Sequence, residues 1–148
     1  MAGRPVVAVH IAVGIALIAA NLLAGLWGGI AWLRDRPAVG FWYALRVAQA
    51  AVFLQAALGM TLLFLRHEAS ELHYLYGALP LLVSFLAELT RAGAAQQELG
   101  GTEFRSLPEA EQQTVALAIL RREMGIMAVS CLVIVFLALR AVGTTPLL

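Results

Sequence analysis

Two histidines in this sequence are each followed, four residues later, by a glycine. The pairs are His10 with Gly14 and His73 with Gly77. Neutral imidazole is the commonest metal ligand that proteins supply. Residues four apart share one face of an α-helix, and a glycine one turn from an imidazole leaves space beside the backbone. The spacing therefore predicts two equivalent half-sites for a flat metal-containing ligand, provided that both segments are helices that face each other.

The composition indicates that these segments are membrane helices. Of the 148 residues, 61% are hydrophobic and 13% are charged, whereas a soluble domain has about 45–50% and about 25%. The mean hydropathy is +0.85. A transmembrane helix needs about 20 mainly apolar residues. We expect a single domain over residues 1–148 with four such spans, at about residues 5–33, 41–65, 71–91 and 124–142.

A polar region at about residues 92–123 separates the last two spans. Gly100 and Gly101 interrupt it, and Ser106 with Glu109 matches the pattern of a capping box at the start of a helix. We therefore expect two helical extensions that form a hairpin outside the membrane. The predicted fold class is an all-α integral membrane protein: an up-down-up-down bundle of four transmembrane helices, with the hairpin extending helices three and four.

This topology brings the two histidines together. Four spans place both ends of the chain and the polar corner at residues 66–71 on one side of the membrane. His10 lies near the start of the first span and His73 near the start of the third, and these spans run in the same direction. We expect the two imidazoles at similar depth. The second span adds Gln55 and, one turn further on, Gly59.

A haem held between two histidines of a helical bundle would need this arrangement. We expect haem b, with His10 and His73 as the axial ligands of its iron. The remaining residues predicted to contact it are Gly14, Gly59, Gly77 and Gln55, with Arg66 placed to meet the propionates. The predicted function is electron transfer or haem handling. No nucleophile elbow, phosphate-binding loop or HExxH motif indicates a hydrolase or a phosphotransferase.

Other interpretations of the same residues stay open. Histidines near a membrane surface can remain hydrated, and glycine is common in membrane helices. The protein would then be a cofactor-free structural or accessory subunit of a larger membrane complex, or a small transporter, although the sequence has no inverted repeat. At the polar corner, His67, Glu68, Glu71 and His73 are residue types that zinc accepts. A solvated corner is the simpler interpretation there.

The second span and the start of the third resemble part of the haem A synthase family and, more loosely, other four-helix membrane cytochromes b. In that family a glutamine-rich, glycine-containing helix is followed by a helix that opens with a haem-ligating histidine. The corresponding residues here are Gln49, Gln55, Gly59 and His73. His10 matches a ligand histidine near the outer end of the preceding helix. The resemblance implies a haem-binding half-bundle over roughly residues 6–90.

The resemblance departs from the family pattern around His10. The family has an acidic residue shortly before this histidine and an arginine just after it. Here the neighbours are Ala8, Val9 and Ile11. The resemblance therefore implies haem binding and carries no expectation of haem A synthase activity.

Charged residues inside and beside the spans predict an ion pair and an orientation. Arg46 in the second span and Glu88 in the third are expected at the same depth, where they would form a structural ion pair. The hairpin side carries six arginines and the histidine side three, which favours a cell-membrane protein with its hairpin in the cytoplasm. Both termini and the histidines would then lie outside.

The expected partners follow from the same distribution of charge. The spans face the lipid bilayer, and the hairpin at residues 92–123 offers a surface to a soluble redox partner or to a neighbouring subunit of a membrane complex. No run of basic residues indicates nucleic-acid binding.

Overall fold

The computed structural model describes residues 3–65 and 68–144. Its elements are α1 (Gly3–Leu33), α2 (Val39–Phe64), α3 (Glu71–Ala92), α4 (Ala94–Leu99), the 3-10 helix η1 (Phe104–Ser106) and α5 (Glu109–Val142). The described residues form no β-strand, so the all-α fold class is confirmed. Within these residues, four segments are long and apolar enough to cross a membrane: Arg4–Leu33, Val39–Phe64, Glu71–Ser106 and Glu109–Val142. This is consistent with a multi-pass membrane protein.

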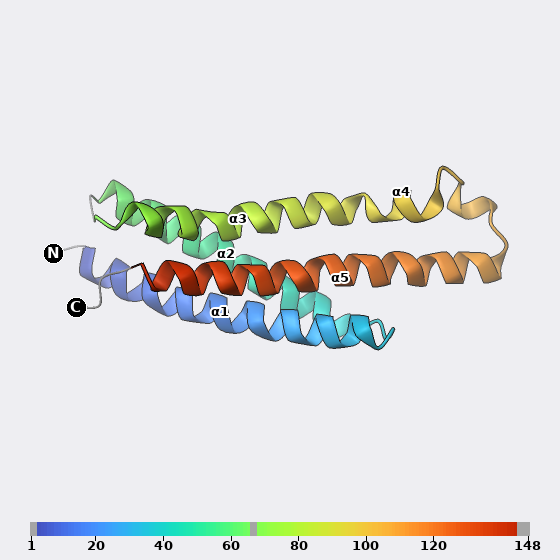
Figure 1. The fold of residues 1–148 in the computed structure, drawn as a ribbon, viewed down its shortest axis with the longest axis horizontal. Helices are drawn as coiled ribbons and strands as arrows, with labels where there is room; N and C mark the ends of the chain where they lie inside the picture. Colours follow the sequence, from blue (N-terminus) through green and yellow to red (C-terminus); the bar gives the residue numbers. More distant parts are fainter. Residues whose placement is uncertain (1–2, 66–67, 145–148) are drawn as a thin grey trace.

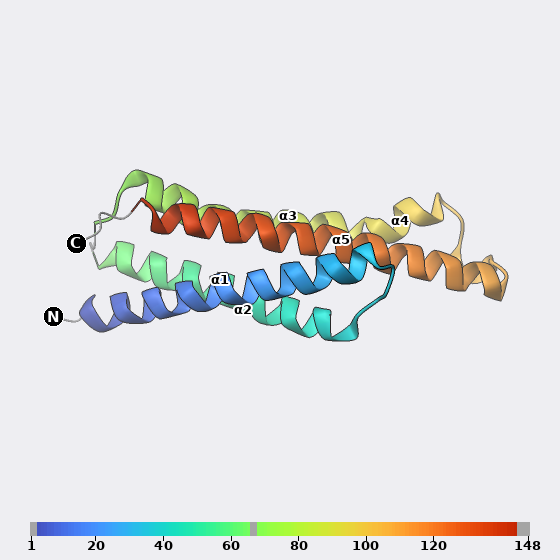
Figure 2. The same ribbon diagram turned by 60° about the horizontal axis from the view of Figure 1, so that its bottom comes forward.

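The helices form two layers, with α1 and α2 in one and α3 and α5 in the other (Figures 1 and 2). α1 packs along both α2 and α5, and α3 packs along α5, whereas α2 and α3 touch over a shorter stretch. α1 and α3 scarcely touch and lie on a diagonal of the bundle. The start of α1, the start of α3 and the end of α5 lie at the same end of the molecule (Figure 1).

Small residues allow the helices to approach closely in the half of the bundle that is nearer the hairpin. Phe41 is fully buried and lies against Gly28 of α1, where a methyl group would collide with its ring. A methyl group on Gly25 would lie 2.7 Å from Cδ2 of Leu132 on α5. Close backbone approach at small residues is the usual basis of helix packing in membranes. α1 is therefore held between α2 and α5.

The hairpin results from the length of α5. This helix has 34 residues and spans about 50 Å, whereas the hydrocarbon core of a bilayer is about 30 Å thick. α3, α4 and α5 extend together beyond the ends of α1 and α2 (Figure 1). An ion pair between Arg122 of α5 and Glu98 of α4, at 2.6 Å, joins the two sides of the hairpin.

The turn of the hairpin confirms one sequence prediction and corrects another. Gly100 and Gly101 have φ of 56° and 90°, a left-handed conformation that glycine adopts without strain, and α4 ends there as predicted. The predicted capping box at Ser106 is wrong. The Ser106 hydroxyl donates to the Glu103 carbonyl at 2.7 Å, because η1 takes up this serine, and α5 begins after Pro108 without a side-chain cap.

Candidate functional site

The two predicted ligand histidines lie close together, although they come from different helices. His10 comes from α1 and His73 from the first turn of α3, and their ring centres lie 6.3 Å apart with an interplanar angle of 59°. A metal ion bonded to one nitrogen of each ring, at about 2.0 Å per bond, would hold two ring centres about 6 Å apart. The spacing therefore suits two imidazoles on opposite sides of one metal ion.

The orientation of His73 is set by its own helix and by α5. Ser70 is the N-cap of α3, because its hydroxyl accepts from the backbone N–H of His73 at 3.2 Å. On the imidazole, Nδ1 lies 3.1 Å from the carbonyl oxygen of Ala141. A carbonyl only accepts, so Nδ1 carries the proton and Nε2 of the neutral ring keeps its lone pair. Metal-ligating histidines are commonly oriented in this way.

His10 is held differently, by a side chain of α2. Its Nε2 lies 3.2 Å from the amide nitrogen of Gln55. Nδ1 of His10 and Oε1 of Gln55 are both buried and have no hydrogen-bond partner among the described residues. The two ends of an amide can be interchanged. With its oxygen toward His10, Gln55 would accept from Nε2–H, and the bare lone pair would stand on Nδ1, where a metal ion would satisfy it.

The three predicted glycines differ in the space they leave. Nothing among the described residues lies within 4 Å of a methyl group placed on Gly77. A methyl group on Gly59 would lie 3.5 Å from Cε1 of His10, and one on Gly14 would lie 3.1 Å from the Gln55 amide nitrogen. The distance between the two imidazoles is compatible with one metal ion between them, whereas a macrocycle beside Gly14 would require the Gln55 side chain to turn aside. Arg66, the predicted propionate partner, lies outside the described residues.

The polar corner has no metal cluster within the part of the chain that the structure describes. No group of three or more His, Cys, Asp or Glu side chains there is arranged to hold a metal ion. Glu68 and Glu71 are exposed, and His67 lies outside the described residues. Among the described residues, His10 and His73 are two histidines from different helices that lie close together.

A second polar cluster lies toward the hairpin, around the predicted ion pair. Nη1 of Arg46 lies 2.7 Å from Oε1 of Glu88. The same carboxylate oxygen accepts from Nε2 of Gln49 at 2.7 Å, and Gln49 also accepts from Arg46 at 2.6 Å. The pair joins α2 to α3 as the sequence predicted, with Gln49 as an additional member.

Arg91 extends this cluster to α5. Its guanidinium donates to Oε2 of Glu88 at 2.9 Å and to Oε2 of Glu123 at 3.3 Å. It also lies over the ring of Trp42, 5.9 Å from the ring centre. Sequence reasoning missed Arg91, although its position three residues after Glu88 was a usable signal. The two arginines and two carboxylates balance in charge, so the cluster acts as a cross-link among α2, α3 and α5.

Comparisons of the chain with protein-family models, with curated proteins and with solved structures found no match. The arrangement of the chain's own side chains is therefore the basis for assigning a function.

Proposed function

We propose that the protein is a small integral membrane haem b protein that transfers electrons or handles haem. One observation carries the proposal: the imidazoles of His10 and His73 come from diagonal helices of the bundle and have their centres 6.3 Å apart. These two residues would be the axial ligands. When bound, the haem would supply a one-electron redox centre.

The surrounding residues would each have a defined task at this site. The Ala141 carbonyl would keep the His73 tautomer whose Nε2 is free to bind a metal. Gly77 would leave the surface of α3 open to a macrocycle. The Gln55 side chain would leave the space beside Gly14 and release its hydrogen bond with His10, because the same amide nitrogen makes both contacts. Ligation by two imidazoles leaves no open position on the iron, which favours electron transfer over oxygen chemistry.

The proposed arrangement in the membrane is an up-down-up-down bundle with the hairpin in the cytoplasm. Among the described residues, the hairpin side carries six arginines and the histidine side carries Arg4 and Arg140. Cytoplasmic loops are enriched in basic residues, which supports this orientation. The hairpin tip is acidic and would present a docking surface to a soluble redox partner or a neighbouring subunit; its charged residues are Glu103, Arg105, Glu109 and Glu111.

A second candidate, a cofactor-free structural or accessory subunit, is favoured by a different observation. The Gln55 side chain already occupies the space beside Gly14 and bonds to His10. In this candidate both histidines are cross-links, from α1 to α2 and from α3 to α5. It differs from the haem proposal in one measurable property, because such a subunit would be colourless.

Visible absorption spectra separate the two candidates. Membranes from haem-replete cells expressing the full chain, and the protein purified from them, should show a Soret band that sharpens on reduction. His10→Ala and His73→Ala should each abolish it, whereas His67→Ala, which removes the third histidine, should leave it unchanged. A colourless wild-type protein in those membranes would refute the haem proposal and support the second candidate.

A ligand exchange keeps the test informative if an alanine variant fails to fold. His73→Met preserves an iron ligand of similar bulk, and methionine–histidine ligation raises the reduction potential of a haem relative to two histidines. We expect a retained Soret band and a higher midpoint potential. An unchanged potential in a folded His73→Met variant would show that His73 does not bind the iron.

A further inference from the structure

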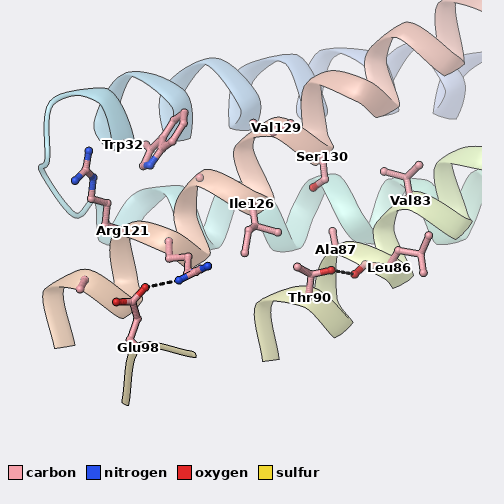
Figure 3. Close-up of a pocket in the computed structure, with 13 residues that line it drawn as sticks. Trp32, Val83, Leu86, Ala87, Thr90, Glu98, Arg121, Ile126, Val129 and Ser130 are labelled. Atoms are coloured by element: carbon pink, nitrogen blue, oxygen red, sulfur yellow. Dashed lines mark hydrogen bonds and ion pairs between the residues drawn. The ribbon is translucent and has the colours of Figure 1, made fainter. Parts of the chain in front are cut away.

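A groove on the outer face of α5 crosses from the apolar part of the bundle to its polar hairpin. Its volume is about 800 Å³, and it lies between the end of α1 and the second half of α3. Figure 3 shows Trp32 of α1 on one side, Leu86 and Thr90 of α3 on the other, and Ile126 and Val129 of α5 between them. The groove is distinct from the histidine site, which lies at the opposite end of the bundle.

The wall formed by Trp32 depends on a glycine. A methyl group on Gly125 would lie 2.8 Å from Cε2 of the Trp32 indole. The missing side chain therefore lets the indole lie directly against α5. Tryptophan is enriched where membrane proteins cross the boundary between hydrocarbon and headgroups. Its position marks the level at which the groove passes from lipid tails to headgroups.

The two ends of the groove differ in chemistry. The deep end is apolar and is lined by Val83, Leu86 and Val129. The hairpin end is lined by Arg121, Arg122 and Glu98. Along α5 the groove runs from residue 118 to residue 130, which corresponds to about 18 Å of helix. The part of α5 beyond the two arginines, from residue 125 to residue 130, covers about 8 Å. One leaflet of a bilayer has about 15 Å of hydrocarbon, so this part would hold the half of an acyl chain that is nearer the headgroup.

The hairpin end carries an excess of positive charge. Arg121 forms an ion pair with Asp35 at 2.6 Å, and Arg122 forms one with Glu98 at 2.6 Å. Arg34 and Arg36 flank Asp35 in the loop between α1 and α2 and are exposed. The charged residues that line the groove are Arg121, Arg122 and Glu98, with a net charge of +1; Arg34 and Arg36 add positive charge in the adjacent loop. Each guanidinium has five N–H donors, so one carboxylate partner leaves donors for a phosphate.

We propose that this groove binds an anionic phospholipid of the leaflet on the hairpin side. One acyl chain would lie along α5 between Val83 and Val129, and the phosphate would bind Arg121 and Arg122. The positive charge at the hairpin end of the groove would favour an anionic headgroup over a zwitterionic one. An apolar protein helix would fill the deep end equally well, but it would bring no acceptor to the N–H donors that the carboxylate partners of Arg121 and Arg122 leave unused.

The test is native mass spectrometry of the full chain in detergent with two added phospholipids that share the same acyl chains. Dioleoylphosphatidylglycerol is anionic and dioleoylphosphatidylcholine is zwitterionic. We expect the anionic lipid to be retained more tightly, by about fivefold for each engaged arginine. Arg121→Gln with Arg122→Gln should remove this preference, and Arg140→Gln, at the far end of α5, should preserve it.

A change of opposite sign distinguishes lipid binding from a structural role of the same arginines. Glu98→Gln removes the carboxylate that competes for Arg122, so it should increase retention of the anionic lipid, whereas a variant that merely disturbs the hairpin would decrease it. Thr90→Trp fills the groove and should weaken retention of both lipids. Leu89→Trp, at the adjacent exposed position outside the groove, should not.

Several results would overturn the proposal. Equal retention of the two lipids by the wild-type chain would exclude headgroup selection, and weaker retention in Glu98→Gln would exclude the role of Arg122. A wild-type dimer that dissociates in Thr90→Trp would show that a second copy of the chain occupies the groove. None of these measurements depends on haem, so the lipid site and the histidine site are tested independently.

Discussion

Glu88 is the residue whose replacement most directly tests how α2, α3 and α5 are held together. Its carboxylate accepts from Arg46, Gln49 and Arg91 at 2.7, 2.7 and 2.9 Å. The Glu88→Gln substitution keeps the size of the side chain and removes its charge. Arg46 and Arg91 would then face each other without a carboxylate between them. We therefore expect this single change to cost more stability than removal of either arginine.

The exposure of the partners sets the magnitudes. The Arg46 side chain is 55% exposed, so its pair with Glu88 is screened by water and should contribute about 0.5–1 kcal/mol. Arg91 and Glu88 are 26% and 29% exposed, and a hydrogen bond between charged groups contributes about 1.5–3 kcal/mol. We expect a loss of about 2 kcal/mol for Glu88→Gln and about 1 kcal/mol for Arg46→Gln.

The decisive measurement is a double-mutant cycle on unfolding in mixed micelles, followed by far-ultraviolet circular dichroism. The Arg46→Gln and Glu88→Gln pair should cost about 0.5–1 kcal/mol less than the sum of the single changes. Glu98 belongs to a different ion pair, with Arg122, so Arg46→Gln combined with Glu98→Gln should be additive. Additive costs in the first cycle would refute the cross-link between α2 and α3.

Two further predictions concern the histidine site and the groove. Gln55→Ala should leave the ratio of haem to protein at or above the wild-type value, because this side chain occupies the space beside Gly14; a fall would mean that it positions His10 instead. Gly125→Leu should expel Trp32 from its place against α5 and lower the free energy of unfolding by about 1–3 kcal/mol. The displacement is measured by tryptophan fluorescence in a chain whose other two tryptophans are replaced. Gly29→Leu is the control, since no described residue lies within 4 Å of that position, and equal shifts would contradict the packing.

The number and type of helices could be predicted from the sequence because long uncharged runs and their breaks are local features. The glycines at positions 100 and 101 end α4, and Ser70 caps α3, and both effects depend on a few neighbouring residues. The meeting of His10 and His73 also followed from topology, because two helices that run in the same direction place residues of similar depth at the same level.

Hydrophobic periodicity does not predict the rotation of each helix. α1 is apolar around its whole circumference, so hydrophobic periodicity does not identify its inward face. The filling of the space at Gly14 by Gln55 therefore had no sequence signal. The partner of the His73 imidazole is the backbone carbonyl of Ala141. Every residue has such a carbonyl, so the residue type at position 141 does not indicate this contact. The Asp35–Arg121 pair joins a loop to a helix that is remote in sequence.

The spacing of the two imidazoles depends on contacts far from the histidine site. His73 is oriented by α5, so the register between α3 and α5 sets its position. That register is secured at the other end of the bundle by the pair of Arg91 with Glu123, about 27 Å away along α3. His10 belongs to α1, so its position depends on that helix, which is fixed between α2 and α5 by contacts at Gly28 and Gly25. Because the helices are stiff, loosening either remote contact should alter the site without changing any residue that lines it.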